Sequence, residues 1–204
     1  MDQRDRERSQ PAFFSRQVKY VRSFYLDLAP SREAALTVVC GGFERCHPDY
    51  VIDRATFQYL GLEFVASGTG TLTLAGQEVA LAPGLVFCYG PGVPHKMVAD
   101  REHPASKYFV DFAGTDAIDR LRECRLGPGA LCHVANPVGI QRVFDDLIQD
   151  GSRGGAMATE LCSSRLQYLI LRIAASLSPG QEDHTVAFST YTRCAVTSRT
   201  TTFG

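Results

Sequence analysis

The sequence predicts a mainly β fold followed by C-terminal helices. Between about residues 20 and 112, short runs rich in apolar and β-branched residues are separated by Gly and Pro, which is typical of many strands with tight turns. After Gly114 the period-2 alternation stops, and apolar residues recur at the spacing of an amphipathic helix. With 204 residues, 45% hydrophobic and 21% charged, the chain can bury the core that such a fold needs.

The clearest strands lie between residues 57 and 89. One of them carries four apolar residues that share a face by period-2 alternation: Leu60, Leu62, Phe64 and Ala66. The turn-forming residues 67–70 (Ser-Gly-Thr-Gly) follow, and Leu72 and Leu74 resume the alternation. We therefore expect an antiparallel hairpin here, with further strands after Gly76 and after Pro83-Gly84.

Two helices are predicted in the C-terminal part. Asn136-Pro137 is a typical helix start, and an apolar stripe follows it and ends before Gly151: Val143, Phe144, Leu147 and Ile148. A longer helix is expected from about Ala156 until Pro179-Gly180 stops it. Its apolar residues recur at helical spacings: Cys162, Leu166, Leu169, Ile170, Ile173 and Leu177.

The opposite side of the longer helix is apolar as well, since it carries Leu161, Tyr168 and Leu171. A helix that is apolar on two faces implies two burials, one within its own domain and one against a second copy of the chain. We expect a homodimer in which four residues of this helix take part: Leu161, Leu166, Leu169 and Ile173. The alternative is a central helix that is buried on both sides within a monomer.

Composition limits the possible functions. Twenty-one basic and 22 acidic side chains give a formal charge of -1, so the chain lacks the positive excess that supplies most affinity for nucleic acid. There is no apolar run of about 18 residues and no signal-peptide core, so we expect a cytoplasmic protein without a membrane segment. The seven cysteines show no C-x-x-C spacing, which argues against a disulfide framework or a zinc knuckle.

Several motifs follow one another in an order found in a known family. They are Asp49-Tyr50-Val51-Ile52-Asp53-Arg54, Leu62-Glu63-Phe64-Val65, Leu81-x-Pro83-Gly84, Gly90-Pro91-Gly92-Val93-Pro94-His95 and Lys107-Tyr108-Phe109-Val110-Asp111-Phe112. Together they resemble the N-terminal sensing domain of AraC-family transcriptional regulators, over about residues 20–178. The resemblance implies a cupin-type double-stranded β-barrel followed by a two-helix dimerisation hairpin.

The resemblance also implies a division of the chain. We expect a flexible N-terminal arm at 1–18, a ligand-binding barrel at 19–115, a helical dimerisation region at 116–180, and a linker with an aberrant tail at 181–204. In the arabinose-responsive member of the family, the barrel holds a sugar and the arm folds over it. The expected partner is therefore a small-molecule effector, a sugar or a related metabolite.

Five residues are candidates for the ligand site. By the resemblance, Arg54 matches an arginine that reaches into the sugar pocket, and Lys107 and Phe109 match pocket-facing positions. Met97 stands where the arabinose-binding member has a polar aromatic, so arabinose itself is not implied, and His95 is a turn or pocket histidine. The alternatives are a surface ion pair for Arg54 and a core position for Phe109.

A metal-dependent cupin enzyme, such as an isomerase or dioxygenase, is the alternative function. Such enzymes bind their metal through an H-x-H pair, a carboxylate and a later histidine. Here the region of the pair reads Thr56-Phe57-Gln58-Tyr59, which leaves Glu63 and His95 as two candidate ligands. We therefore expect no catalytic residue, no metal and no cofactor. A ligand-free dimerisation scaffold is a third possibility if bulky side chains fill the barrel.

AraC-family regulators continue into two helix-turn-helix units that bind DNA. Residues 191–194 resemble the approach to that domain, whereas residues 195–204 do not. We expect DNA contact only through a domain absent from this chain, and we hypothesise a frameshift or truncation of the gene near Ala195.

Overall fold

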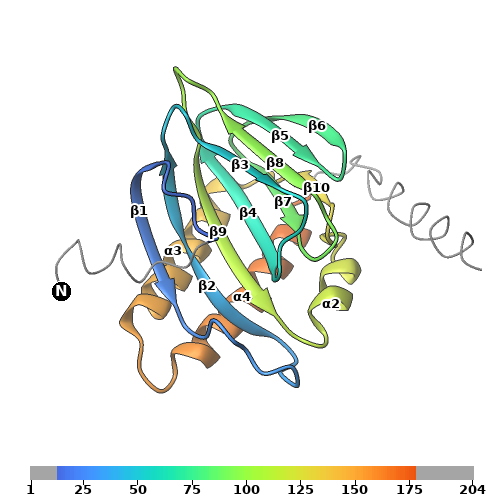
Figure 1. The fold of residues 1–204 in the computed structure, drawn as a ribbon. Helices are drawn as coiled ribbons and strands as arrows, with labels where there is room; N and C mark the ends of the chain where they lie inside the picture. The colour runs from blue at the N-terminus through green and yellow to red at the C-terminus, as the bar shows by residue number, and fades with distance from the viewer. Residues whose placement is uncertain (1–12, 178–204) are drawn as a thin grey trace, which may run out of the picture.

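Two β-sheets face each other, and two helices cover the outer face of the larger sheet (Figure 1). The structure is a computed structural model that describes residues 13–177, so the predictions for 1–12 and 178–204 lie outside the described residues. All strand pairs within the two sheets are antiparallel. The predicted fold class is confirmed: a mainly β, cupin-like barrel comes first and the helices follow.

The larger sheet has six strands. Their order across the sheet is β1 (Val18–Tyr25), β2 (Thr37–Cys46), β9 (Ser106–Ala113), β4 (Leu60–Ser67), β7 (Leu85–Tyr89) and β10 (Leu131–His133). The smaller sheet has the order β3 (Val51–Arg54), β8 (His95–Ala99), β5 (Gly70–Leu74) and β6 (Gln77–Leu81). β1 is an edge strand, since it pairs with β2 alone.

The hairpin expected between residues 60–66 and 72–74 is wrong. β4 pairs with β7 and β9 in the larger sheet, whereas β5 pairs with β6 and β8 in the smaller one. Residues 68 and 69 carry the chain from one sheet to the other. The local hairpin is β5–β6, where Ala75 and Gly76 both have positive φ (50° and 86°), as a tight hairpin turn requires.

In the described part of the chain, three helices follow β9: α2 (Ala117–Glu123), α3 (Pro137–Arg153) and α4 (Ala158–Ala175). The predicted start of α3 is confirmed, because the Asn136 side chain accepts a 3.0 Å hydrogen bond from the Gly139 amide and Pro137 opens the helix. α3 continues past Gly151, where the ring of Phe24 lies against the helix in the place that a Cβ atom would take. β10, between α2 and α3, was not predicted.

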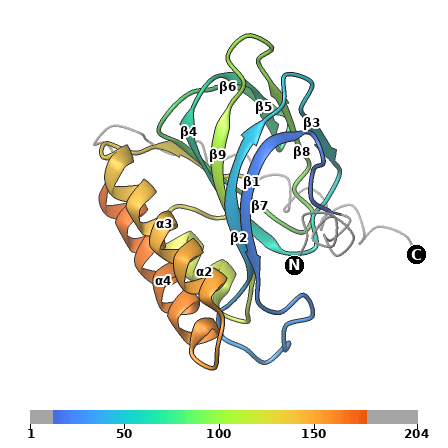
Figure 2. The ribbon, with the colours of Figure 1, turned by 90° about the vertical axis from the view of Figure 1, so that its left-hand side faces the viewer.

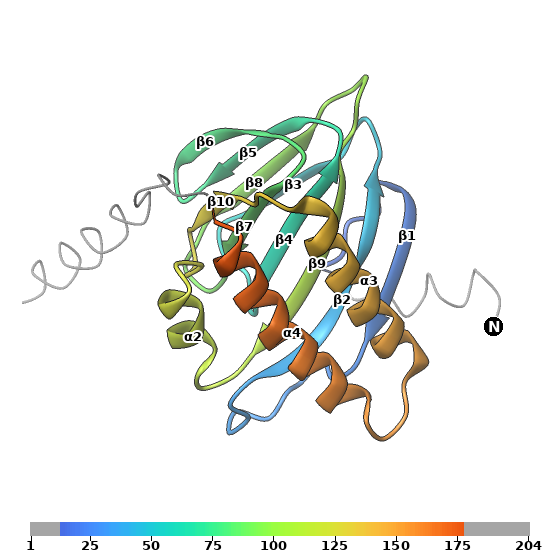
Figure 3. The same cartoon turned by 180° about the vertical axis from the view of Figure 1, so that it is seen from behind.

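α3 and α4 lie on one side of the larger sheet and pack against β1, β2 and β9 (Figures 2 and 3). The outward side chains of β4 and β9 form one core with the inward faces of α3 and α4. Its large buried members are Leu60, Leu62, Phe64, Val110, Phe112, Phe144, Leu147, Leu166, Leu169 and Ile173. The face predicted for Leu60, Leu62 and Phe64 is confirmed. Within residues 13–177, no helix is long and apolar enough to span a membrane.

Candidate ligand-binding site

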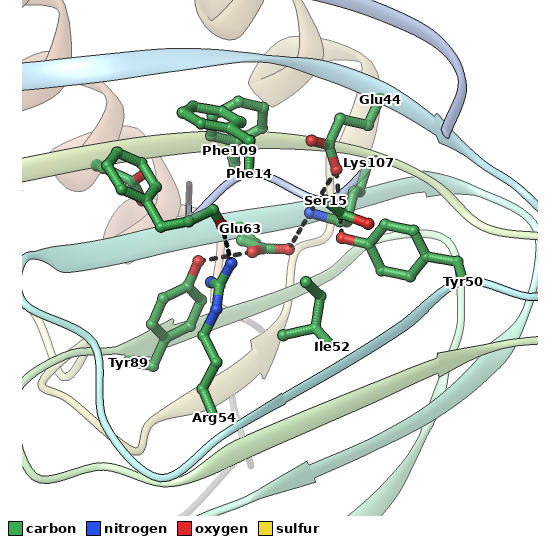
Figure 4. A pocket seen from close by; sticks show the side chains of 12 residues that line it. Phe14, Ser15, Glu44, Tyr50, Ile52, Arg54, Glu63, Tyr89, Lys107 and Phe109 are labelled. Carbon is green, nitrogen blue, oxygen red and sulfur yellow. Dashed lines mark hydrogen bonds and ion pairs between the residues drawn. The ribbon is translucent and has the colours of Figure 1, made fainter. Parts of the chain in front are cut away.

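A cavity lies between the two sheets, against the inner face of the larger one (Figure 4). Its free space is about 30 Å³, which is room for a water molecule or two rather than for a sugar. Twelve residues line it: Phe13, Phe14, Ser15, Glu44, Tyr50, Ile52, Arg54, Glu63, Tyr89, Lys107, Phe109 and Asp111. The cavity is therefore lined by charged and aromatic side chains.

Lys107 forms a buried ion-pair network with two glutamates. Its Nζ lies 3.1 Å from Glu44 Oε2 and 2.8 Å from Glu63 Oε2, and all three side chains are less than a tenth exposed. Burial alone would lower the pKa of Lys107, but attraction to Glu44 and Glu63 outweighs it and holds the pKa well above its ordinary value. The ammonium therefore stays charged between β2 and β4.

Two tyrosine hydroxyls complete this network. Tyr89 donates to Glu63 Oε1 at 2.7 Å, and Tyr50 donates to Glu44 Oε2 at 3.3 Å (Figure 4). Tyr89 reaches Glu63 because Gly61 lies directly opposite it on β4, where a Cβ would meet the tyrosine ring at 2.5 Å. Burial and the nearby Glu63 raise the pKa of Tyr89 well above its usual value, so the hydroxyl keeps its proton and remains a donor.

The N-terminal segment contributes three residues to the lining of the cavity, Phe13, Phe14 and Ser15. Phe13 packs edge-to-face on Phe57 and Tyr59, with ring centroids 5.6 and 5.9 Å apart. Phe14 packs in the same way on Phe109, at 5.4 Å. The Arg54 guanidinium donates a hydrogen bond to the Phe13 carbonyl and lies over the ring of Phe57 (5.0 Å). Residues of the predicted arm thus contact a predicted ligand-site residue directly.

Three of the five candidate ligand residues line the cavity: Arg54, Lys107 and Phe109. His95 lies one layer away, with its ring stacked on Tyr89 at 3.9 Å, and burial lowers its pKa so that the neutral form is favoured. Met97 is buried in the core between the sheets and is not among the residues that line the cavity.

Several lining residues were not predicted, notably Glu44, Tyr89 and Asp111. The sequence does contain a signal for two of the charged lining residues, Asp111 and Glu63. Lys107 and Asp111 stand four residues apart in an otherwise apolar strand, so they share a face, and Glu63 stands alone in another such strand. Charged residues in buried strands are rare unless they are paired, and this pattern indicates a polar interior.

The predicted dimerisation residues are divided between the two faces of α4. Leu166, Leu169 and Ile173 are fully buried within the chain, where they belong to the core between helices and sheet. Leu161 is 47% exposed and shares the outer face with Tyr168 and Leu171, which are 48% and 61% exposed. A second copy can therefore meet α4 only through this outer face while the fold stays intact.

No group of three or more His, Cys, Asp and Glu residues within the described part of the chain, 13–177, could hold a metal ion. The carboxylate considered for a metal, Glu63, is instead paired with the Lys107 ammonium.

Comparisons with known proteins identify a family. The model of the AraC-like ligand binding domain matches residues 39–170, and no helix-turn-helix domain is detected. No protein with a curated description matches. Similar solved structures include the Clostridium difficile EutQ protein (16% identity, TM-score 0.32, 39% of this chain and 59% of that one) and KdgF from Halomonas sp. (17%, 0.34, 46% and 78%). A Cupin_2 domain of an XRE family transcriptional regulator from Enterobacter cloacae is a third (14%, 0.32, 35% and 78%).

Proposed function

Since this chain belongs to the family of AraC-like ligand-binding domains, we propose that it is the ligand-sensing and dimerisation module of an AraC-type transcriptional regulator. The domain of this family is a regulatory module rather than an enzyme. The effector that we propose is a sugar or a related polyhydroxylated metabolite, bound inside the barrel.

The observation that supports this proposal is the polar cavity enclosed by the barrel. Carboxylates, tyrosine hydroxyls and the Arg54 guanidinium offer both acceptors and donors for hydroxyl groups. The ring of Phe109 adds an apolar face of the kind on which a sugar ring packs. Sites for small molecules combine such apolar surfaces with a few convergent polar groups.

The free space requires that part of the lining moves when a sugar binds. Small-molecule pockets usually enclose about 300–1,000 Å³, far more than the 30 Å³ left here. Phe13 and Phe14 are the side chains best placed to leave, because they belong to the chain's N-terminal segment rather than to a strand of the barrel. We propose that the effector takes their place beside Arg54 and Phe109.

A thermal-shift screen against pentoses and hexoses tests this function. A sugar at about 100 times its Kd adds about 2.7 kcal/mol of stability, which raises the Tm of a domain of this size by about 5–10 °C. The shift should disappear in Arg54→Ala and persist in Arg101→Ala, a matched change at an exposed position. A panel without any shift, or a shift of equal size in both variants, contradicts the proposed sugar site.

A ligand-free dimerisation scaffold is the second candidate function, and the small free volume is the observation that favours it. The screen separates the two functions, because a scaffold binds no member of the panel. The buried charges argue against a scaffold, since an interior that only has to be filled is more stable when it is apolar.

We further propose that a homodimer forms through the outer face of α4, around Leu161, Tyr168 and Leu171. In this proposal the protein acts in the cytoplasm, and DNA is contacted by a helix-turn-helix domain rather than by the ligand-binding domain at residues 39–170. The formal charge of -1 supports that division, because the chain itself offers no positive excess to a phosphate backbone.

A further inference from the structure

One oxygen of a cavity carboxylate has neither a hydrogen-bond donor nor an ion-pair partner within residues 13–177. Asp111 lies on β9, is 3% exposed and lines the cavity. Its Oδ2 accepts a hydrogen bond from the Cys40 thiol at 3.2 Å, but no described residue donates a hydrogen bond to its buried Oδ1. Glu44 and Glu63, by contrast, share the Lys107 ammonium and each accept a tyrosine hydroxyl. A buried acceptor without a donor lowers the stability of the folded state, so the site is one donor short.

The charges around the cavity also leave Asp111 without a counter-ion of its own. Three carboxylates and two cationic side chains line the cavity, and Lys107 is already held between the two glutamates. The other cation, Arg54, donates to the Phe13 carbonyl. A ligand group that brings a negative charge next to Asp111 would meet repulsion from this carboxylate, only part of which Arg54 can offset once the Phe13 carbonyl is displaced.

We infer that Asp111 is the specificity-determining residue of the proposed effector site, which accepts a hydrogen bond from a hydroxyl or ammonium group of the effector and excludes effectors that carry a carboxylate or phosphate. This inference rests on the proposed function, because it concerns the ligand of the same cavity. A hydroxyl and an ammonium group share the needed chemistry, a donor without negative charge.

The cost of keeping Asp111 supports a role in binding rather than in stability. Burial raises the pKa of Asp111 from 3.8 to about 7, even though the hydrogen bond from Cys40 lowers it. Six side chains from the surrounding elements act on this carboxyl group electrostatically. They are Cys40 on β2, Arg54 on β3, Tyr59 just before β4, Glu63 on β4, Tyr89 on β7 and Lys107 on β9. Ionisation of Asp111 therefore works against the folded state, and such costs are typical of functional positions.

The first experiment needs no ligand. Because the folded-state pKa lies above the unfolded value, the contribution of Asp111 to stability is complete below about pH 4 and is lost as the pH rises through about 7. The urea midpoint of the wild type should therefore fall from pH 4 to pH 8 relative to Asp111→Asn, which should be the more stable protein at pH 8. Asp119→Asn, the same change at an exposed position, should follow the wild type. Parallel profiles for the wild type and Asp111→Asn would overturn the inference.

The second experiment measures selectivity with matched sugars. Glucose and galactose are compared with their amino sugars and their uronates by titration calorimetry. At pH 8, where Asp111 is ionised, the wild type should bind a neutral or amino sugar and discriminate against its uronate by about tenfold or more, which corresponds to about 1.4 kcal/mol. Asp111→Asn should lose that discrimination, while Asp119→Asn should keep it. Comparison of the affinities for the neutral sugars and the amino sugars shows whether the donor is a hydroxyl or an ammonium group.

The outcomes separate this inference from the function on which it rests. If the wild type binds a uronate at least as tightly as its neutral sugar, the selectivity of Asp111 is refuted while the sugar site stands. If no member of the panel binds, the proposed function fails and the inference fails with it.

Discussion

The two faces of the six-stranded sheet use the same strands for opposite purposes. On β9, the outward residues Tyr108, Val110 and Phe112 belong to the core under the helices, whereas the inward residues Lys107, Phe109 and Asp111 line the cavity. Because side chains alternate along a strand, one eight-residue segment builds an apolar core and a charged interior. The outer face is arranged for stability, and the inner face keeps groups that cost stability.

The largest effect is expected on the outer face. Phe144 on α3 is fully buried, with its ring stacked on Phe64 at 6.1 Å and tilted on Tyr108 at 5.3 Å. Phe144→Ala should lower the free energy of unfolding by about 4 kcal/mol, because it leaves a cavity in a packed core. Urea denaturation measures this loss. A loss below about 1 kcal/mol would show that the helices contribute little to stability, and would contradict the view that the outer face of the sheet is the stabilising one.

The next largest effect concerns the inner face. Lys107→Met removes the cation between Glu44 and Glu63 and should cost about 3 kcal/mol in urea denaturation, because two buried carboxylates lose their counter-ion. The triple variant with Glu44→Gln and Glu63→Gln should recover most of this loss. If the triple variant is no more stable than the single one, the lysine acts through the packing of its methylene chain and not through its charge.

A smaller effect is expected where the N-terminal segment enters the cavity. Phe14 is only partly buried, so Phe14→Ala should cost about 1–2 kcal/mol, less than a change in the core. The same change should tighten the binding of whichever sugar shifts the Tm, because the effector then has less to displace. Calorimetry of wild type and variant checks this, and weaker binding by the variant would show that Phe14 contacts the ligand rather than competing with it.

The smallest effect on stability is expected on the outer face of α4. Leu161→Ser with Leu171→Ser alters two exposed side chains and should change monomer stability by less than about 0.5 kcal/mol per site. Sedimentation should nevertheless show loss of the proposed dimer. A protein that sediments as a dimer with both substitutions does not use this face.

Local patterns predicted the elements well and their partners poorly. The alternation of residues 60–66 gave the correct buried face, and Asn136-Pro137 gave the correct helix start. The predicted partner of β4 was wrong, because the turn-forming residues 67–70 are compatible both with a hairpin and with a crossing to another sheet. The three residues of β10 are too few to show a period, and they become a strand only because β7 offers its edge.

The candidate site was only partly predictable for a related reason. Arg54, Lys107 and Phe109 were found through motif resemblance, since each stands in a recognisable strand. Asp111 was part of the same motif, but its missing donor is a property of three-dimensional surroundings. The contact between Phe13 and Arg54 joins residues 41 positions apart, and nothing in the charged N-terminal segment indicated it.

The edge position of β1 affects how the proposed effector can enter a barrel that has little free space. β1 continues directly from the N-terminal segment that contributes to the cavity lining, and only one of its sides is hydrogen-bonded to another strand. On the side of the helices, β1 is held by the Arg22–Asp145 ion pair and by the packing of Phe24 on Gly151, and its Tyr25 ring packs on Phe14. Fraying of such a strand costs far less than global unfolding, so its amides should exchange with deuterium earlier than those of β9. We therefore expect the proposed effector to enter through a local opening of β1, while the other strands stay folded.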